Sequence, residues 1–388
     1  MNTGSPSFMR RMNKRIVFDI IKQKKVISKP ELCEITNLKP PTMNSIVDNL
    51  LADGLIVCVG KGESNSQGGP RPNLYSLNGK GRYFIGLDIN GKGILGVIMS
   101  INSEIAATAQ RQDVAYRDQE HLTQLILEIV NELLAKAGVG MEKLGRVGIS
   151  VAALVNIERG IIVSVPESLF NNYAIIEALS PHIKAGIYVD NDINMIALGQ
   201  RLLVDELRKL NNVVCIGIRD GMGLSIIIDG KVYRGKDGLS GNVQGISHAE
   251  SEHAMLERVR AYLKANRGRM EHYAGLDIDR MTVQDMYEAV KNDEEIAGVV
   301  NESFVQIGQL AAMMEQLLGP DGIIFAGEIF NYNKMFFKTI VEASQMSPTF
   351  KPMPQTDFYE VPLARNTIAC CAALNTINEF YRLDNIIS

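Results

Sequence analysis

The pattern of apolar and polar positions changes near residue 80. Before this point, apolar residues recur at steps of three and four over short stretches, as in small amphipathic helices. After it, apolar runs of strand length alternate with longer amphipathic segments. The pattern predicts an N-terminal domain over residues 1–80, followed by a larger α/β body.

The first two predicted helices carry clear boundary signals. Helical spacing runs from about Lys14 to Lys24, and Ser28-Lys29-Pro30-Glu31 then forms a capping box with proline in the first turn. In the second helix we expect Leu32 and Ile35 to point inward. Asn37 is expected to end this helix in the left-handed conformation.

The third predicted helix follows Lys39 and begins with two prolines. Its apolar stripe is Met43, Ile46, Val47, Leu50 and Leu51. Beyond Gly54, the strands LIVCVG and LYSLN enclose the glycine-rich loop GKGESNSQGGPRP. Two helices joined by a short turn and followed by such a hairpin predict a winged helix-turn-helix.

In this reading the polar face of the third helix meets DNA. Thr42, Asn44 and Ser45 would face the major groove, while Lys39 and Arg71 would contact phosphates or a narrow A·T minor groove. The alternative is a small helical cap that binds no nucleic acid.

The body begins with strand-like runs from Tyr83, and the segment after Asn211 repeats the same rhythm of strand, glycine-rich turn and strand. Two similar units predict a duplicated, two-lobed α/β fold with a cleft between the lobes. We expect the first lobe to span residues 81–195, completed by residues 365–388, and the second to span residues 196–364.

One polar cluster stands at a predicted strand–helix junction. The stretch VDNDINMIALGQ, Val189 to Gln200, places Asp192 between Asn191 and Asn194. A carboxylate at this junction could bind a polyol or act on a transferable phosphate. Asn and Asp are also common in turns and helix N-caps, so the residues alone leave both interpretations open.

Charge is distributed unevenly along the chain. The first 80 residues carry 12 Lys and Arg against six Asp and Glu, a surplus of six positive charges. The whole chain has a net charge of −4, so the remainder carries −10. A basic module on an acidic body suggests that the first part meets a polyanion, although basic N-terminal stretches are often simply solvated.

Cysteine usage and hydropathy narrow the class of protein. The five cysteines, Cys33, Cys58, Cys215, Cys370 and Cys371, show no Cys-x-x-Cys spacing, so we expect reduced thiols and no structural zinc. The N-terminus has no signal-peptide pattern, and no apolar run approaches the ~18 residues of a membrane span. A cytoplasmic protein without membrane contact is expected.

Several motifs together make the chain resemble the ROK family (repressors, open reading frames and kinases). The resemblance spans the winged helix, a linker at Gly69–Pro72 and the two-lobed body. Its motifs are GLDINGKG at 86–93, IYVDNDINMIALG at 187–199, DGMG at 220–223 and LLGPDGIIFAGEIF at 317–330. The resemblance implies an actin-like, sugar-kinase-like body.

The resemblance also implies a sugar site. In the family's kinases the Asp of the Asn-Asp motif is the general base and the Asn contacts the sugar, which corresponds here to Asp192 and Asn191. Three further sugar contacts are implied at Ser168, Asn242 and Glu257.

The departures from the family pattern lie in the motifs that bind the nucleotide and the metal. The first phosphate loop reads Asn90-Gly91-Lys92 in place of Gly-Gly-Thr, and the second keeps Gly221 and Gly223 but has Asp220 before them. The family's Gly-Glu-x-Gly-His reads Gly-Asn-Val-Gln-Gly from Gly241, and its cysteine-rich zinc loop is missing. Each change taken alone could be sequence drift in a loop. Lys92 could still bind a phosphate. His248 could be a sugar contact or a hydrogen-bonded histidine at the surface.

Together these changes favour a sensor over an enzyme. We expect a sugar-responsive transcriptional repressor that needs neither ATP nor zinc and has no catalytic residues. Its expected partners are operator DNA, a sugar effector and further copies of itself, as a homodimer or a higher oligomer. The alternative is a sugar kinase with an appended DNA-binding domain, in which Asp192 would be the general base. A body that docks another protein has no sequence feature to support it.

Overall fold

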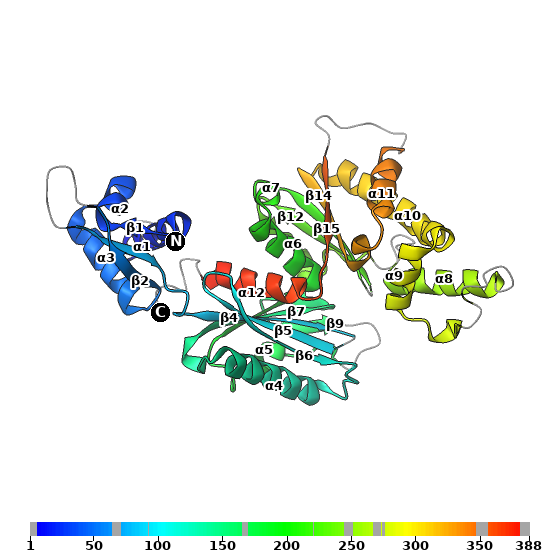
Figure 1. Cartoon of the computed structure of the whole chain (residues 1–388), viewed down its shortest axis with the longest axis horizontal. Helices are drawn as coiled ribbons and strands as arrows, with labels where there is room; N and C mark the ends of the chain where they lie inside the picture. Colours follow the sequence, from blue (N-terminus) through cyan, green and yellow to red (C-terminus); the bar gives the residue numbers. More distant parts are fainter. Residues whose placement is uncertain are drawn as a thin grey trace.

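The N-terminal helices begin and end where the sequence places their caps. The computed structural model describes residues 6–380 apart from 64–70, 92, 165–169, 220, 244–250, 267–272, 274–275 and 347–355. The N-terminal elements are α1 (Pro6–Lys24), β1 (Ile27–Ser28), α2 (Lys29–Thr36), α3 (Pro40–Ala52), β2 (Ile56–Lys61) and β3 (Asn73–Leu77). Strands β1, β3 and β2 form a three-stranded antiparallel sheet beside the helices (Figure 1).

The capping box and the left-handed terminator of α2 are confirmed. The backbone N–H of Ser28 donates to the Glu31 carboxylate (2.9 Å), and Asn37 has φ 56°. Two expectations are wrong. Helix α1 begins at Pro6, about two turns before Lys14, and Ile35 is 49% exposed because Leu32 alone of the two faces the core.

A short connection, residues 78–82, joins the winged helix to the body. Asn78 donates hydrogen bonds to the carbonyls of Leu55 (backbone N–H, 2.9 Å) and Gly54 (Nδ2, 2.9 Å), and Gly81 N–H donates to Asn78 (2.8 Å). A Cβ at Gly81 would collide with the Gly54 carbonyl, so this position requires glycine. The connection is therefore fixed against the winged helix by its own backbone.

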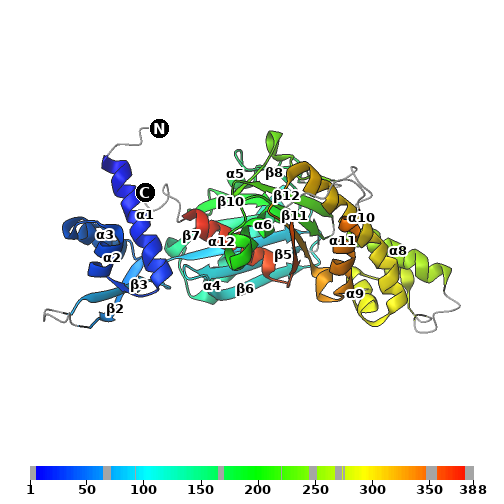
Figure 2. The ribbon, with the colours of Figure 1, turned by 90° about the horizontal axis from the view of Figure 1, so that it is seen from above.

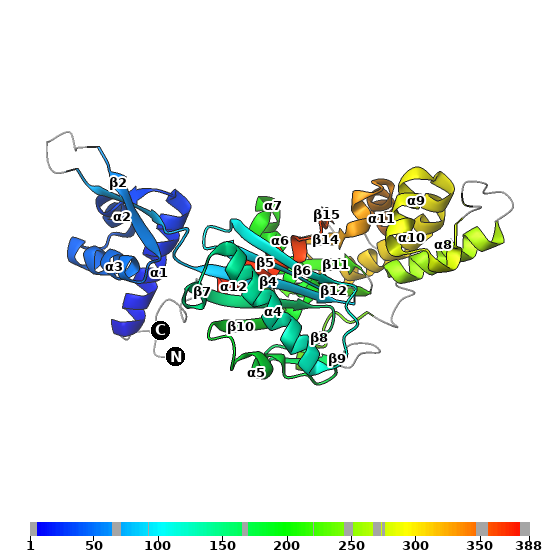
Figure 3. The same cartoon turned by 60° about the horizontal axis from the view of Figure 1, so that its bottom comes forward.

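The winged helix and the body also share one hydrophobic cluster. Val17, Phe18 and Ile21 of α1 belong to the same cluster as Phe84 at the start of the body and Ile377 near its end. The two parts lie side by side in all three views (Figures 1, 2 and 3). The N-terminal domain is thus packed on the body.

The first lobe is built on a five-stranded sheet in the order β10-β7-β4-β5-β6. Strands β4, β5 and β6 pair antiparallel, whereas β4, β7 and β10 run parallel. The strands are β4 (Tyr83–Asn90), β5 (Gly93–Ser100), β6 (Ile105–Gln112), β7 (Leu144–Val151) and β10 (Gly186–Asn191), and β8 (Leu154–Asn156) and β9 (Ile161–Ser164) form a separate hairpin.

The second lobe repeats this topology. Its order, read from the parallel edge, is β15-β14-β11-β12-β13. As in the first sheet, the first two pairs in this order, β15–β14 and β14–β11, are parallel, and the last two, β11–β12 and β12–β13, are antiparallel. The strands are β11 (Val213–Ile218), β12 (Met222–Ile228), β13 (Lys231–Val232), β14 (Gly322–Gly327) and β15 (Asp357–Pro362). The predicted duplication is therefore present in the chain.

Two long helices lie between the sheets, a short helix packs beside the first of them, and the other helices of the body cover the outer faces (Figures 1 and 3). The inner pair is α6 (Asp192–Leu203) and α12 (Thr367–Phe380), which pack against each other. The short helix α7 (Asp205–Arg208) packs through Leu207 with residues of α6. The outer helices are α4 (Gln119–Ala137), α5 (Ile175–Leu179), α8 (Glu252–Ala265), α9 (Val283–Asn292), α10 (Glu294–Leu318) and α11 (Met335–Gln345), and the short 3-10 helices are Met141–Lys143, Lys236–Gly238, Ile278–Arg280 and Glu328–Asn331.

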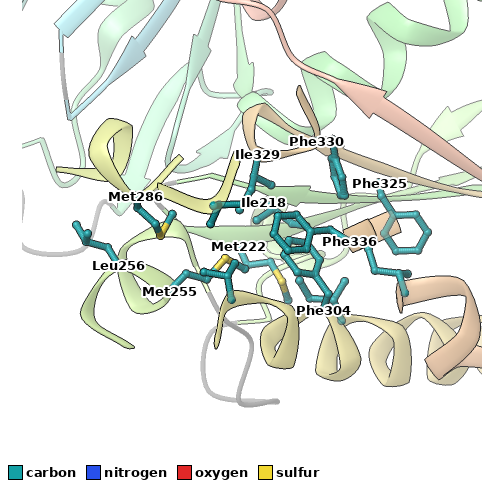
Figure 4. Packing of buried hydrophobic residues seen from close by; sticks show 14 of the residues in the cluster. Ile218, Met222, Met255, Leu256, Met286, Phe304, Phe325, Ile329, Phe330 and Phe336 are labelled. Carbon is teal, nitrogen blue, oxygen red and sulfur yellow. The ribbon is translucent and has the colours of Figure 1, made fainter. Parts of the chain in front are cut away.

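Aromatic and methionine side chains fill the outer core of the second lobe (Figure 4). Phe304 stacks on Phe336 with ring centroids 4.3 Å apart, and Met222, Met255 and Met286 lie in the same cluster. Within the described residues, no helix is both long and apolar enough to cross a membrane.

The contact between α6 and α12 gives a stability prediction. Gly199 of α6 lies so close to Cys371 of α12 that a Cβ at this position would overlap it, and we expect Gly199→Ala to lower the free energy of unfolding by about 1–3 kcal/mol. The matched control is Gly298→Ala in α10, where the space is open. That change should raise stability by about 0.5–1 kcal/mol because alanine favours the helix. Denaturant titrations in which Gly199→Ala is as stable as Gly298→Ala would contradict this packing.

Candidate functional site

The Asn-Asp motif lies at the junction between β10 and α6. Oδ1 of Asn191 accepts hydrogen bonds from the backbone N–H groups of Ile193 (2.9 Å) and Asn194 (3.4 Å), and Nδ2 donates to the Ala153 carbonyl (3.0 Å). Asn191 is therefore the N-cap of α6. Of the two interpretations left open by the sequence, the capping role holds for Asn191, and Asp192 is left to face the cleft.

Asp190 supports this junction from behind. Its carboxylate is 1% exposed and receives both guanidinium nitrogens of Arg234, at 2.9 and 2.7 Å. The Tyr188 hydroxyl (2.7 Å), the Asn191 backbone N–H (2.8 Å) and Asn194 Nδ2 (3.0 Å) also donate to it. This buried network fixes the strand end that carries Asp192.

A cavity of about 390 Å³ opens in front of Asp192. Its walls come from both lobes, and the expected ligand residues Asn191, Asp192 and Asn242 all line it. The phosphate-loop remnants Gly91, Gly221 and Gly223 line it as well, whereas Asn90 faces a neighbouring cavity. A volume of this size suits a monosaccharide-sized ligand.

Asp192 is paired with an arginine that the sequence interpretation overlooked. Arg219, directly after β11, donates through Nη1 to Asp192 and through Nη2 to Asp88 at the end of β4 (3.2 Å). Burial raises the pKa of Asp192, and the positive charge of Arg219 partly opposes that rise. The signal available in the sequence was an arginine directly before the DGMG motif at 220–223.

Arg219 also separates two compartments, because it lines the cavity in front of Asp192 and a second cavity of about 580 Å³. Four carboxylates line the second cavity, from Asp88, Asp113, Glu252 and Glu328. Of its other arginines, Arg111 is paired with Glu132 (2.7 Å). With Arg219 and Arg365 included, four carboxylates face three arginines in the lining, so the compartment has no surplus of positive charge to attract a nucleotide phosphate.

One of the expected sugar contacts, Glu257, does not join the cleft. Glu257 lies on the exposed side of α8, where it pairs with Arg260 (2.6 Å), and it does not line the cavity. The carboxylate that α8 turns inward is Glu252, which is 4% exposed and bonded to the Tyr287 hydroxyl. Ser168, Lys92, Asp220 and His248 lie outside the described residues.

The polar face of α3 is open to solvent. Lys39, Thr42, Asn44 and Ser45 are exposed, and Arg71 is exposed at the base of the wing. Lys14 of α1 is paired with Asp53 (2.7 Å). The described residues therefore present a polar, cation-flanked face of the kind that meets a DNA groove.

The described residues contain no cluster of three or more metal-ligating side chains. All five cysteines are free, and Cys371 is buried in α12. No arrangement in this part of the chain would hold the zinc that the family's cysteine loop carries.

Comparison with known proteins gives consistent matches over most of the chain. A family model described as "ROK family" matches residues 84–364. The chain is 22% identical to a xylose repressor of Caldicellulosiruptor bescii over 358 residues, covering 87% of this chain and 88% of that protein. It is also 22% identical to the N-acetylglucosamine repressor of Escherichia coli O157:H7 over 353 residues, covering 87% and 85%.

Solved structures show the same fold in two versions. A ROK family transcriptional regulator, described as a homologue of the E. coli MLC protein, superposes with a TM-score of 0.78 at 20% identity, covering 98% of this chain and 99% of that one. A ROK family glucokinase from Streptomyces griseus, in complex with glucose and AMPPNP, gives 0.66 at 19% identity and covers 76% and 98%. The regulator therefore matches nearly the whole chain, and the kinase matches about three quarters of it.

Proposed function

The chain belongs to the ROK family, and from this membership we propose that it is a sugar-responsive DNA-binding repressor of transcription. Its body would bind a sugar or sugar derivative in the cavity in front of Asp192. Two relatives that each match 87% of its length are named as repressors of xylose and of N-acetylglucosamine. A regulator of this kind acts in the cytoplasm, where its operator lies.

The observation that carries the proposal is the position of Arg219. A sugar kinase needs its aspartate free to take a proton from a hydroxyl, with the nucleotide phosphate nearby. Here Arg219 neutralises Asp192 and stands between the sugar cavity and the adjoining compartment. This arrangement keeps a carboxylate for binding hydroxyl groups and removes the path for phosphoryl transfer.

We propose Asp192 as the principal hydrogen-bond acceptor for the sugar, with Asn242 as a second polar contact. Asn191 would act mainly by holding Asp192, since its side chain is already bonded to the backbone. We also propose domain boundaries near residues 80 and 195, with α12 completing the first lobe. Two copies of the chain would read paired half-sites, as helix-turn-helix dimers do.

The test of sensing is calorimetric titration with D-xylose and with N-acetyl-D-glucosamine, the sugars in the relatives' names. Binding of one of them, together with a change in operator affinity, is the expected result. Coupled measurement of ADP release with the same sugars should show no sugar-dependent turnover. Steady ATP consumption that depends on the sugar would replace this proposal with the kinase.

DNA binding gives a second prediction. We expect Thr42→Ala and Asn44→Ala each to weaken binding to a specific operator by about 1–3 kcal/mol, the range for a contact to a base edge. The control is Gln23→Ala, an exposed position that belongs to α1 and not to α3 or the wing. Fluorescence anisotropy on an operator selected from random duplexes would measure the change, and affinity should fall steeply with salt. Equal affinities for all three variants would remove α3 as the recognition helix.

A further inference from the structure

Three charged groups meet at the bottom of the cleft, and they come from different parts of the fold. Asp88 lies on β4 of the first lobe, Asp192 begins α6, and Arg219 follows β11 of the second lobe. Strands β4 and β11 are the corresponding first strands of the duplicated lobes. Asp88, near the end of β4, and Arg219, directly after β11, are thus opposite charges near the ends of corresponding strands, joined across the cleft.

The guanidinium is shared between the two carboxylates. One nitrogen, Nη1, binds Asp192, and the other, Nη2, binds Asp88 Oδ2 at 3.2 Å. The side chains of Asp88 and Asp192 are 6% and 7% exposed, so water screens these interactions little. A sugar hydroxyl that binds Oδ2 of Asp192 therefore competes with Arg219.

Asp88 has an acceptor that is not in use. Its Oδ1 is buried and has no hydrogen-bond partner among the described residues, whereas its Oδ2 binds both Arg219 and Asn90. An unsatisfied buried acceptor carries a desolvation cost that a donor would remove. The two nitrogens of a guanidinium match the two oxygens of one carboxylate.

We propose that Arg219 exchanges partners when the sugar binds. Without sugar it bridges Asp192 and Asp88; with sugar, a hydroxyl takes its place on Asp192 and both guanidinium nitrogens bind Asp88. The charge balance of one guanidinium and two carboxylates stays the same in both states. This inference rests on the proposed sugar-sensing function.

The exchange would link the sugar to the arrangement of the lobes. In the bridged state Arg219 connects the second lobe to the start of α6 and to the first lobe, and in the exchanged state it connects the second lobe to the first lobe alone. A sugar that stabilises one of these states over the other shifts the population by its difference in affinity. Asp88 thereby affects sugar binding without lining the sugar cavity.

The test measures sugar affinity in Asp88→Asn by calorimetry, with D-xylose and N-acetyl-D-glucosamine as probes. An asparagine cannot offer two charged oxygens to the displaced guanidinium, so we expect affinity to fall about tenfold. Asp113→Asn is the matched control, because Asp113 lines the same compartment as Asp88; it should bind sugar as wild type does.

The double variant Asp88→Asn/Arg219→Gln separates exchange from general damage. Without Arg219 there is no displaced guanidinium for Asp88 to bind. This variant should therefore bind sugar with the same affinity as Arg219→Gln alone. If Asp88→Asn does not fold, Arg219→Lys serves instead. It keeps the charge without the two-pronged geometry and should also weaken sugar binding.

Three results would overturn the exchange. One is a sugar affinity of Asp88→Asn equal to that of wild type. Another is a loss of sugar affinity on Asp88→Asn that is equally large in the wild-type and the Arg219→Gln backgrounds. The third is the absence of binding of either sugar by wild type and by Arg219→Gln. That result would reject the sugar-sensing function itself, and it is recognisable because it appears before Asp88 is changed.

Discussion

Asp192→Asn is expected to weaken sugar binding by about 1.5–3 kcal/mol, the range for a hydrogen bond to a charged group. The substitution keeps the size of the side chain but removes the charge that accepts hydrogen bonds from hydroxyls. Operator binding without sugar should be nearly unchanged, because the proposed DNA contacts lie on α3 and the wing. Titration calorimetry and operator anisotropy on the same preparation would separate the two effects.

A matched control for Asp192→Asn is Asp237→Asn in the 3-10 helix Lys236–Gly238. Asp237 is exposed and has φ 55°, a conformation that asparagine also tolerates. It should bind sugar normally. Full sugar affinity in Asp192→Asn would remove Asp192 from the site, whereas sugar-dependent ATP turnover in wild type that this variant abolishes would identify a kinase.

Sugar affinity should also depend on pH in a defined direction. Burial raises the pKa of Asp192, so this carboxylate takes up a proton at a higher pH than an ordinary aspartate does. Its capacity to accept hydrogen bonds from the sugar falls once it is protonated. Affinity should therefore decline on acidification, and Asp192→Asn should lack this part of the decline.

Asp190→Ala is expected to lower the free energy of unfolding by about 3–5 kcal/mol, the cost of leaving one partner of a buried ion pair alone. Asp190 is 1% exposed, and the side chain of Arg234 is 23% exposed, so the guanidinium would lose both its bonds away from bulk water. Urea denaturation followed by circular dichroism measures the effect.

The control for Asp190→Ala is Asp205→Ala, which breaks an ion pair with Arg208 at the surface. The Asp205 and Arg208 side chains are 77% and 57% exposed, and such pairs contribute about 0–1 kcal/mol. Similar losses in the two variants would mean that the Asp190 network does not hold the strand end. A large loss in Asp190→Ala alone would agree with its role behind Asp192.

The sequence predicted the second and third N-terminal helices well because their signals are local. The capping box at Ser28, the terminator at Asn37 and the apolar stripe of α3 act within a few residues of one another, and each is present. The duplication of the lobes was visible as a repeated rhythm. Ile35 was misplaced because helical spacing alone does not show which flank of a short helix meets the core.

The cleft was predicted only in part because its contacts join distant segments. Asp88 and Arg219 are 131 positions apart, and no periodicity relates them. Glu257 was carried over from the family pattern across a missing loop. In a helix, a shift of one position turns a side chain by about 100°, so this alignment could not fix which glutamate faces inward. The structure turns Glu252 inward instead.

The fixed connection at residues 78–82 has a consequence for how an operator is read. A flexible tether would let each winged helix search for its half-site independently, with a loss of conformational entropy on binding. Here hydrogen bonds at Asn78 and Gly81 and a shared apolar cluster settle the position of α3 during folding. In a dimer, the distance between the two recognition helices, and hence the half-site spacing that the protein accepts, would then be a geometric property of the paired bodies.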